Sequence, residues 1–233
     1  MALADIVTRA KKPVRFKMSY EEYLAWHDED TRAEWVDGEV IIHMPVKPIH
    51  QIVLGFLSQL LSLYIELYDL GQLLVAPLEM KIDIEANSRE PDILFIAKEN
   101  LYRLTEDRLA GPADLIVEII SQESVRRDRD DKFKEYRAAG VREYWLIDPR
   151  PRKERADFYW LNESGEYQLL GTEDDERVES QVLAGFWLKP AWLWQAQSLR
   201  ATMAFYEVQG LTAEQIATIQ GLLRGDKPKG DNQ

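Results

Sequence analysis

The run DLIVEII at residues 114–120 most constrains the fold, because one carboxylate, Glu118, stands in the middle of its apolar residues. Side chains alternate between the two faces of a strand, so both faces of this run are apolar and a central position in a sheet is predicted. A carboxylate buried there without a partner costs several kcal/mol or is protonated. We therefore expect Glu118 to meet a metal ion, a lysine or an arginine, or else to lie at a strand end in water.

A second carboxylate, Asp92, opens the strand that precedes this run. It follows Pro91, whose fixed φ and missing N–H suit the start of a strand. If the two strands are antiparallel neighbours, Asp92 lies beside Glu118. Two adjacent carboxylates repel each other unless a hard divalent cation lies between them, and Mg²⁺ typically takes one or two protein carboxylates with waters and substrate phosphates. Taken alone, Asp92 is equally consistent with a turn carboxylate.

A charged helical segment over 126–139 follows Glu118 and ends at Gly140. Its six basic and four acidic residues give it a local positive excess. Tyr136 belongs to its apolar stripe, and Lys132 lies at the edge of that stripe, one turn earlier. Lys132 is therefore predicted to reach back to the strand of Glu118, whereas most of the other charges fit a solvated helix face held by ion pairs.

Helical and strand patterns alternate along the rest of the chain. A capping box at Ser19 begins a short helix, and the Asp37-Gly38 pair between alternating flanks predicts a hairpin. Residues 50–148 follow the order α-β-β-β-α-β, which indicates an α/β fold with a mixed sheet and helices against it. The elements predicted for this core are a long helix over 50–69, strands at 72–84, 91–96 and 114–120, the charged helix and a strand at 143–148. Beyond the core we expect a hairpin within 158–170, an aromatic-rich stretch at 182–194 and a terminal helix from Thr212.

Composition narrows the chemistry further. The 233 residues include no Cys, which excludes disulfides, thiolate catalysis and Cys-based zinc or iron–sulfur sites. The 41 acidic and 29 basic residues give a net charge of −12, so a polyanion would have to be met by a local basic patch or by metal ions. No phosphate-loop, dinucleotide-binding or zinc-protease motif is present. We expect no signal peptide and no membrane span, and therefore a cytoplasmic location.

Taken together, these motifs resemble the PD-(D/E)xK nuclease superfamily and, more closely, its Uma2-type proteins, also called DUF820. The resemblance covers about residues 18–195. It is carried by YEEYLAW at 20–26, EWVDGEV at 34–40, REPDILFI at 89–96, DLIVEIIS at 114–121 and DRDDKFKEYRAAGVREYWLIDP at 128–149.

The resemblance implies a restriction-endonuclease-like α-β-β-β-α-β core with an N-terminal helix and hairpin and a C-terminal β extension. The domain organisation that we expect is one endonuclease-like domain with flanking segments. Its parts are a basic N-terminal arm at 1–17, the domain at 18–195 with its core at 50–148, a helical extension at 196–224 and a flexible tail at 225–233.

The resemblance also implies the roles of the site residues. Asp92, Glu118 and the backbone carbonyl of Ile119 would hold Mg²⁺, with Mn²⁺ as a substitute. Ile120 stands where the superfamily pattern has its lysine, and Lys132 is the residue that takes this role. Lys81 is the substitute if Lys132 does not reach the site.

Two further residues match family positions. His50 opens the long helix and would contact the metal-bound water or the phosphate, or else is a polar residue at a helix start. Glu34 precedes the hairpin turn and is either a further acid of the site or the partner of a basic residue.

These features predict a metal-dependent DNA endonuclease that binds DNA weakly and in a salt-dependent way. A catalytically degenerate protein that acts as a binding or interaction module is the alternative, and a hydrolase of RNA or another phosphoester is a third. We expect a homodimer, in which Trp187, Trp192 and Trp194 either form the interface or belong to the core.

Overall fold

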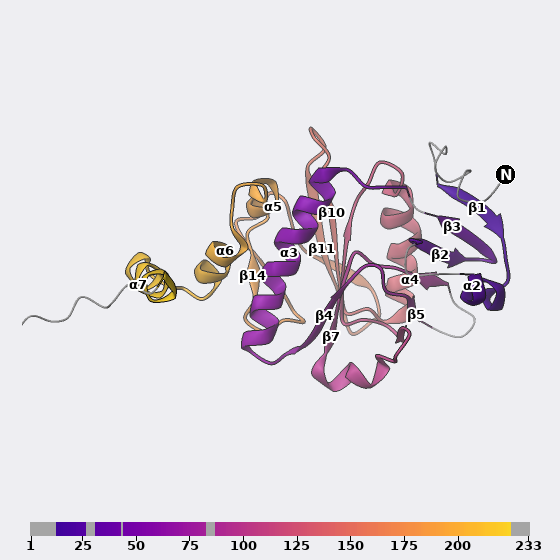
Figure 1. The fold of residues 1–233 in the computed structure, drawn as a ribbon, viewed down its shortest axis with the longest axis horizontal. Coiled ribbons are helices and arrows are strands. Elements are labelled where there is room, and N and C mark those ends of the chain that lie inside the picture. The colour runs from indigo at the N-terminus through magenta and orange to yellow at the C-terminus, as the bar shows by residue number, and fades with distance from the viewer. Residues whose placement is uncertain (1–12, 27–30, 43, 83–86, 225–233) are drawn as a thin grey trace, which may run out of the picture.

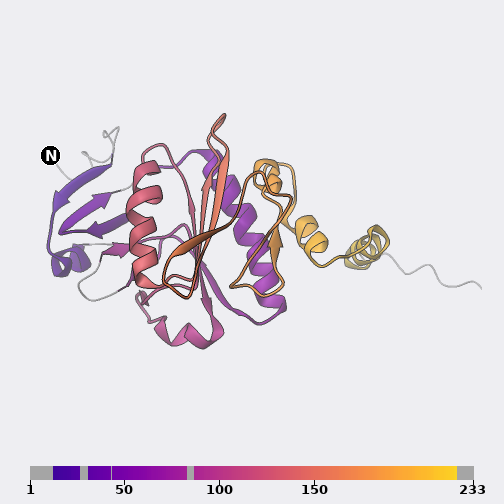
Figure 2. The ribbon, with the colours of Figure 1, turned by 180° about the vertical axis from the view of Figure 1, so that it is seen from behind.

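Two six-stranded sheets and the helices against them make up the computed structural model, which describes residues 13–26, 31–42, 44–82 and 87–224. The N-terminal sheet has the strand order β1-β3-β2-β6-β5-β8, and the central sheet has the order β12-β11-β10-β9-β7-β4. In Figure 1 the N-terminal sheet lies at the end of the molecule opposite the C-terminal helices. Figure 2 shows the same arrangement from behind.

The predicted hairpin is confirmed and forms the middle of the N-terminal sheet. Strands β2 (Ala33–Val36) and β3 (Glu39–Ile42) pair antiparallel across a tight turn. Asp37 and Gly38 both have positive φ, at 50° and 79°, as the two central residues of such a hairpin turn require. The capping box of Ser19 is also present at the start of α2 (Tyr20–Trp26).

One N-terminal prediction is wrong in part. The arm expected over 1–17 ends in a strand, β1 (Val14–Lys17), which pairs antiparallel with β3. Its apolar residues Val14 and Phe16 pack against a small cluster around Tyr23. This alternation of apolar and basic residues is a strand signal, which the local excess of basic charge concealed. Residues 1–12 lie outside the described residues.

The mixed sheet predicted from the α-β-β-β-α-β order is confirmed. Strands β9 and β10 are parallel, and the other neighbours in the central sheet pair antiparallel. All five residues of β9 are buried, as expected for a central strand. The strands are β4 (Gly71–Val75), β7 (Ile93–Ala97), β9 (Leu115–Ile119), β10 (Glu143–Asp148), β11 (Arg155–Leu161) and β12 (Tyr167–Thr172).

The single strand predicted over 72–84 is instead two strands in different sheets. Its first part is β4, and β5 (Met80–Lys81) belongs to the N-terminal sheet. There β5 lies between β6 (Ser88–Arg89) and β8 (Leu109–Ala110). The chain therefore crosses between the two sheets twice before Asp92, which brings the sheets together at one edge.

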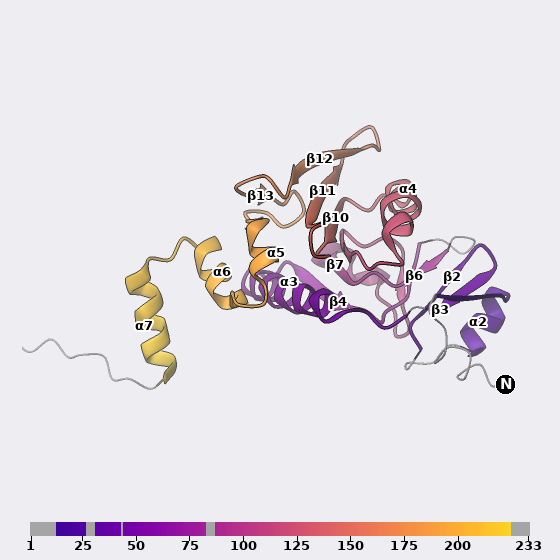
Figure 3. The ribbon, with the colours of Figure 1, turned by 90° about the horizontal axis from the view of Figure 1, so that it is seen from above.

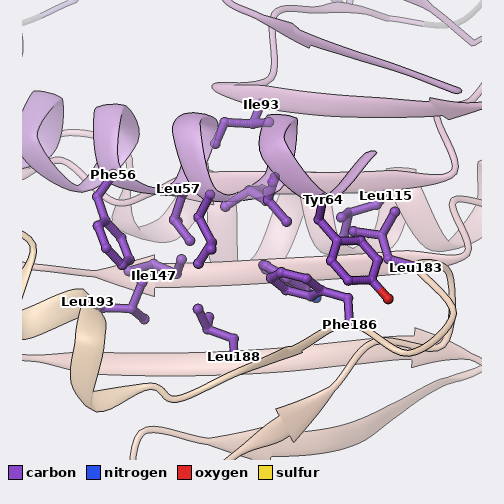
Figure 4. Close-up of a cluster of buried hydrophobic side chains, with 14 of the residues drawn as sticks. Phe56, Leu57, Tyr64, Ile93, Leu115, Ile147, Leu183, Phe186, Leu188 and Leu193 are labelled. Atoms are coloured by element: carbon purple, nitrogen blue, oxygen red, sulfur yellow. The ribbon is translucent and has the colours of Figure 1, made fainter. Parts of the chain in front are cut away.

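The helix α3 (Pro48–Leu67) covers one face of the central sheet. Leu57 is fully buried, and the cluster around it includes Ile93 of β7, Leu115 of β9 and Ile147 of β10 (Figure 4). The helix is long and apolar enough to cross a membrane, but seven of its residues lie buried in this core. Its apolarity is accounted for by packing against the sheet.

The opposite face of the central sheet packs against α4 (Lys132–Ala139), which a π-helical turn at Arg127–Asp131 precedes. Ile116, Leu146 and Tyr136 belong to this second core. Figure 3, seen from above, shows α3 and α4 on different sides of the strands. The helix ends at Gly140, whose φ of 82° is typical of a C-terminal cap.

The C-terminal segment adds β13 (Val178–Glu179), β14 (Trp187–Leu188), α5 (Ala191–Gln195), α6 (Ala201–Val208) and α7 (Ala213–Arg224). Trp192 is buried, and Trp187 and Trp194 pack against the larger core. These tryptophans therefore lie in the core or against it, which is one of the two roles considered for them. The helix α7 projects away from the sheets, with none of its residues buried (Figure 1). The tail at 225–233 lies outside the described residues.

Candidate active site

A small polar pocket lies where the two sheets meet. The carboxylates Asp92 and Glu118 line it from the central sheet, and Arg32 and Glu34 line it from the N-terminal sheet. Ile93 of β7 pairs with Val117 of β9 in antiparallel register, which brings the preceding and following residues, Asp92 and Glu118, side by side. This confirms the predicted neighbourhood of the two acids. The enclosed space is about 30 Å³, which is room for a water or an ion.

Asp92 is held by three donors. Its Oδ2 accepts a hydrogen bond from the Ile119 backbone N–H at 2.8 Å and lies 3.1 Å from His50 Nε2, while Oδ1 accepts one from Arg32 Nη2 at 2.6 Å. Burial raises the pKa of the Asp92 carboxyl, but the hydrogen bond and charge of His50 and the charge of Arg32 outweigh it. They hold that pKa well below its usual range, so Asp92 is a carboxylate.

His50 comes from the first turn of α3. Its Nε2 contacts Asp92, and its buried Nδ1 has no hydrogen-bond partner within the described residues. His50 thus lies in the pocket and orients Asp92. It is therefore part of the site and not only a polar residue at a helix start.

Glu118 has a different environment from Asp92. Its Oε1 accepts hydrogen bonds from Lys132 Nζ at 2.6 Å and from the Tyr136 hydroxyl at 2.8 Å. Burial raises the pKa of Glu118 to about 7, with nearby carboxylates adding to the rise and Lys132 opposing it. Within the described residues Oε2 has no hydrogen-bond partner. One oxygen of Glu118 is therefore free to take a ligand in the pocket.

Lys132 reaches the site as predicted, from the first residue of α4. Besides Glu118, its Nζ contacts Glu34 Oε1 at 3.0 Å and lies 3.9 Å from Asp128 Oδ1. Burial lowers the pKa of Lys132, but the surrounding carboxylates outweigh it and raise that pKa, so the ammonium stays charged. Ile120, where the superfamily pattern has its lysine, is buried in the second core.

Both readings of Glu34 hold. It is fully buried in the site, and it also pairs with basic residues. Its Oε1 contacts Lys132 Nζ and accepts the backbone N–H of Glu90 at 3.3 Å, and its Oε2 lies 3.2 Å from Arg89 Nη1. Glu34 therefore ties the hairpin to the lysine of α4.

The substitute role considered for Lys81 is wrong. Its Nζ lies over the ring of Tyr20, 3.8 Å from the centroid, and 4.8 Å from the ring of Trp35. This cation–π contact holds Lys81 among residues of the N-terminal sheet and α2. Lys81 is not among the residues that line the pocket.

Sequence reasoning missed Arg32, which lines the pocket, and Arg89, which lies outside the pocket lining and contacts Glu34. Arg89 is 1% exposed and bridges Glu34 to Glu135 of α4, with Nη2 2.6 Å from Glu135 Oε1. It lies in the REPDILFI motif, where its proximity to Asp92 was a usable signal. Arg32 had no such signal, because it precedes a strand and only the tertiary fold brings it to Asp92.

The donor set fits one hard divalent cation. Asp92 and Glu118 supply oxygen ligands, the backbone of Ile119 lies at the pocket wall, and Glu118 Oε2 has no hydrogen bond within the described residues. Among those residues there is no group of three or more His, Cys, Asp or Glu placed to hold a metal. A divalent cation held by Asp92 and Glu118 would therefore have few protein ligands and would complete its shell with water or phosphate.

The mixed sheet, the paired carboxylates and the nearby lysine define a nuclease-like protein. A family profile described as "Uma2: Putative restriction endonuclease" matches residues 20–191, and the chain belongs to this family.

Solved structures with the same fold include one described as the crystal structure of a putative nuclease belonging to DUF820 from Anabaena variabilis, with a TM-score of 0.62 and 16% identity. The match covers 77% of this chain and 98% of that one. A comparison with curated proteins gives no match.

Proposed function

We propose that the protein is a metal-dependent endonuclease that hydrolyses phosphodiester bonds of DNA, with Mg²⁺ as its cation and Mn²⁺ as a substitute. The observation that carries this proposal is the pairing of two buried carboxylates, Asp92 and Glu118, with a buried lysine on the second. Family membership supports the nuclease class. We assign the activity to a single domain over residues 18–195, with 196–224 as an extension.

Asp92, Glu118 and the carbonyl of Ile119 would hold the cation. When bound, it would polarise the phosphate and lower the pKa of a bound water. The backbone N–H of Ile119 and the ring of His50 keep the Asp92 carboxylate oriented. Tyr136 does the same for Glu118, since its hydroxyl fixes Oε1 and leaves Oε2 for the ligand.

Lys132 would orient the attacking water and offset the charge that develops on the phosphoryl oxygens. Its Nζ lies between Glu118 and Glu34, at 2.6 and 3.0 Å, so its position is fixed before substrate arrives. Glu34 would thus act through Lys132, as a positioning residue.

Basic side chains beside the pocket support DNA as the substrate. Arg127 lines the pocket, and Arg129, 24% exposed, follows on the same π-helical turn. The net charge of −12 predicts weak binding that falls steeply with salt. A homodimer is part of the proposal, because cutting both strands of a duplex takes two sites, and a cytoplasmic location is expected for such an enzyme.

The second candidate is a nucleic-acid-binding module without catalysis. One observation favours it: Asp92 and Glu118 each already carry a cation of the chain, Arg32 and Lys132. In that case the pairs would be permanent, and no divalent cation would enter.

Cleavage assays separate the two candidates. Supercoiled plasmid, single-stranded DNA and RNA are incubated with the wild type and Mg²⁺ or Mn²⁺, and with Asp92→Asn, Glu118→Gln and Lys132→Met. Asp130→Asn and Lys134→Met, exposed positions on the same segment, serve as matched controls. We expect metal-dependent nicking by the wild type and both controls and a loss of about 100-fold or more in the three site variants. If the wild type cleaves none of the substrates with either metal, the proposed endonuclease activity is refuted.

A further inference from the structure

Arg32 is the most exposed of the basic side chains that contact the carboxylates of the pocket. Its side chain is 32% exposed, against 12% for Arg127 and 3% for Lys132. It comes from the residue before β2, at the edge where the two sheets meet. Arg32 therefore stands at the mouth of the pocket, whereas Lys132 stands at its floor.

The hydrogen bonds of Asp92 leave only one oxygen for an incoming cation. Oδ2 is held by the backbone N–H of Ile119 and by His50, and the backbone donor cannot leave without disturbing the sheet. Among the residues that the structure describes, Oδ1 is held by Arg32 alone. A divalent cation that binds Oδ1 competes with the guanidinium for that oxygen, because an arginine stays charged and the two positive groups repel each other.

The Arg32 guanidinium uses only part of its hydrogen-bonding capacity in its position on Asp92. Within the described residues, Nη2 on Asp92 is its one hydrogen-bonding atom, and its buried Nε has no partner. A guanidinium presents a planar fork of donors that matches the oxygens of a phosphate in a two-bond contact. Once Arg32 has left Asp92, its N–H donors are free to bind a phosphate of the substrate at the pocket mouth.

We infer that Arg32 is a phosphate-binding residue of this site, which neutralises Asp92 until a divalent cation takes its place on Oδ1. The inference rests on the proposed function and adds a residue and an order of events to it. With a divalent cation on Oδ1, Arg32 would leave Asp92, and the freed guanidinium would bind a phosphate of the substrate. Cation binding thereby prepares the substrate contact.

Two measurements on one set of variants test this exchange. Mn²⁺ affinity is measured by calorimetry without DNA, and cleavage of single-stranded DNA is measured at saturating Mn²⁺. The variants are Arg32→Ala and Arg32→Lys, with Arg15→Ala as control, since Arg15 is exposed on β1 and contacts Glu39 only at 4.0 Å. Thermal unfolding without metal verifies that each variant is folded.

We expect Arg32→Ala to bind Mn²⁺ about tenfold more tightly than the wild type, because its competitor is gone. The same variant should lose about 100-fold in kcat/KM at saturating Mn²⁺, mostly through KM. Arg32→Lys should restore the wild-type metal affinity but only part of the cleavage. A gain in Mn²⁺ affinity together with a loss in kcat/KM is not a result that general damage to the fold produces.

The outcomes separate this inference from the proposed function. If the wild type binds Mn²⁺ and cuts DNA but Arg32→Ala has unchanged metal affinity or unchanged kcat/KM, the inference is wrong and the proposed function stands. If the wild type neither binds Mn²⁺ nor cuts, the proposed function fails and the inference fails with it.

Discussion

Lys132 Nζ lies 2.6 Å from Glu118 Oε1, and both side chains are buried. The lysine comes from α4 and not from the strand of the carboxylate, where Ile120 packs into the second core instead. The superfamily pattern has its lysine on the strand of the acid, two residues after it. In this protein the positive charge paired with Glu118 comes from α4 instead. This relationship predicts how changes at Lys132 and Glu118 alter the stability and activity of the protein.

Lys132→Met should abolish cleavage and also weaken the fold. Removing one partner of a buried pair leaves the other charge uncompensated, at a cost of about 3–5 kcal/mol. Chemical denaturation measures the free energy of unfolding, with Lys134→Met as the exposed control. The double variant Lys132→Met/Glu118→Gln should regain part of the loss, since it removes both charges. Equal stability of Lys132→Met and the wild type would contradict the claim that Lys132 compensates the buried charge of Glu118.

The stability of the metal-free protein should fall as the pH rises through the pKa of Glu118. Burial raises that pKa from 4.5 to about 7, so the folded state binds the proton more tightly than the unfolded chain does. Ionising Glu118 therefore costs folding free energy, by about 3 kcal/mol at most once the pH exceeds 7. Below pH 4.5 the carboxyl is protonated in both states and the cost is absent.

Glu118→Gln removes this titration, so the stability difference between the variant and the wild type should shift in favour of the variant between pH 5 and pH 8. Thermal unfolding without metal measures the difference, and Glu99→Gln, at an exposed position, is the matched control. A constant difference between Glu118→Gln and wild type across that range would contradict the raised pKa.

Arg89→Met should destabilise the protein by about 3–5 kcal/mol, because it removes a buried guanidinium that neutralises both Glu34 and Glu135. The matched control is Arg15→Met, whose ion pair is exposed and should be worth less than about 1 kcal/mol. Urea denaturation compares the two variants. A small effect of Arg89→Met would show that Arg89 does not hold α4 to the hairpin.

Two glycine substitutions should have opposite signs. Gly38→Ala places a side chain at a φ of 79° in the hairpin turn and should cost about 1 kcal/mol. Gly55 lies within α3, where an added Cβ meets nothing within 4 Å, so Gly55→Ala should stabilise by about 0.5–1 kcal/mol. Thermal unfolding of both variants checks the two signs. A neutral Gly38→Ala would contradict the turn geometry.

Local patterns were sufficient to predict much of the fold and part of the site. The apolar strand around Glu118, the Asp37-Gly38 turn and the long helix are set by residues near one another in sequence. Asp92 and Glu118 could be paired because strand order and register decide which residues meet. Lys132 could be placed because a helix that follows a strand packs back onto it.

The remaining residues of the site depend on contacts that no local pattern encodes. Arg32 meets Asp92 across 60 residues of sequence, and Arg89 meets Glu135 across 46. Lys81 was misjudged because its cation–π partner Tyr20 comes from α2. The strand predicted over 72–84 was misjudged because only the assembled sheets decide that β5 pairs away from β4.

The central claim is that Asp92 and Glu118 together hold one divalent cation. Calorimetric titration of Mn²⁺ into the wild type and into Asp92→Asn tests it most directly, because Asn keeps the shape of Asp and removes the charge. We expect one Mn²⁺ site per chain in the wild type. The Mn²⁺ affinity should be at least tenfold weaker in Asp92→Asn and unchanged in Asp130→Asn. Equal Mn²⁺ affinity in the wild type and Asp92→Asn would contradict it.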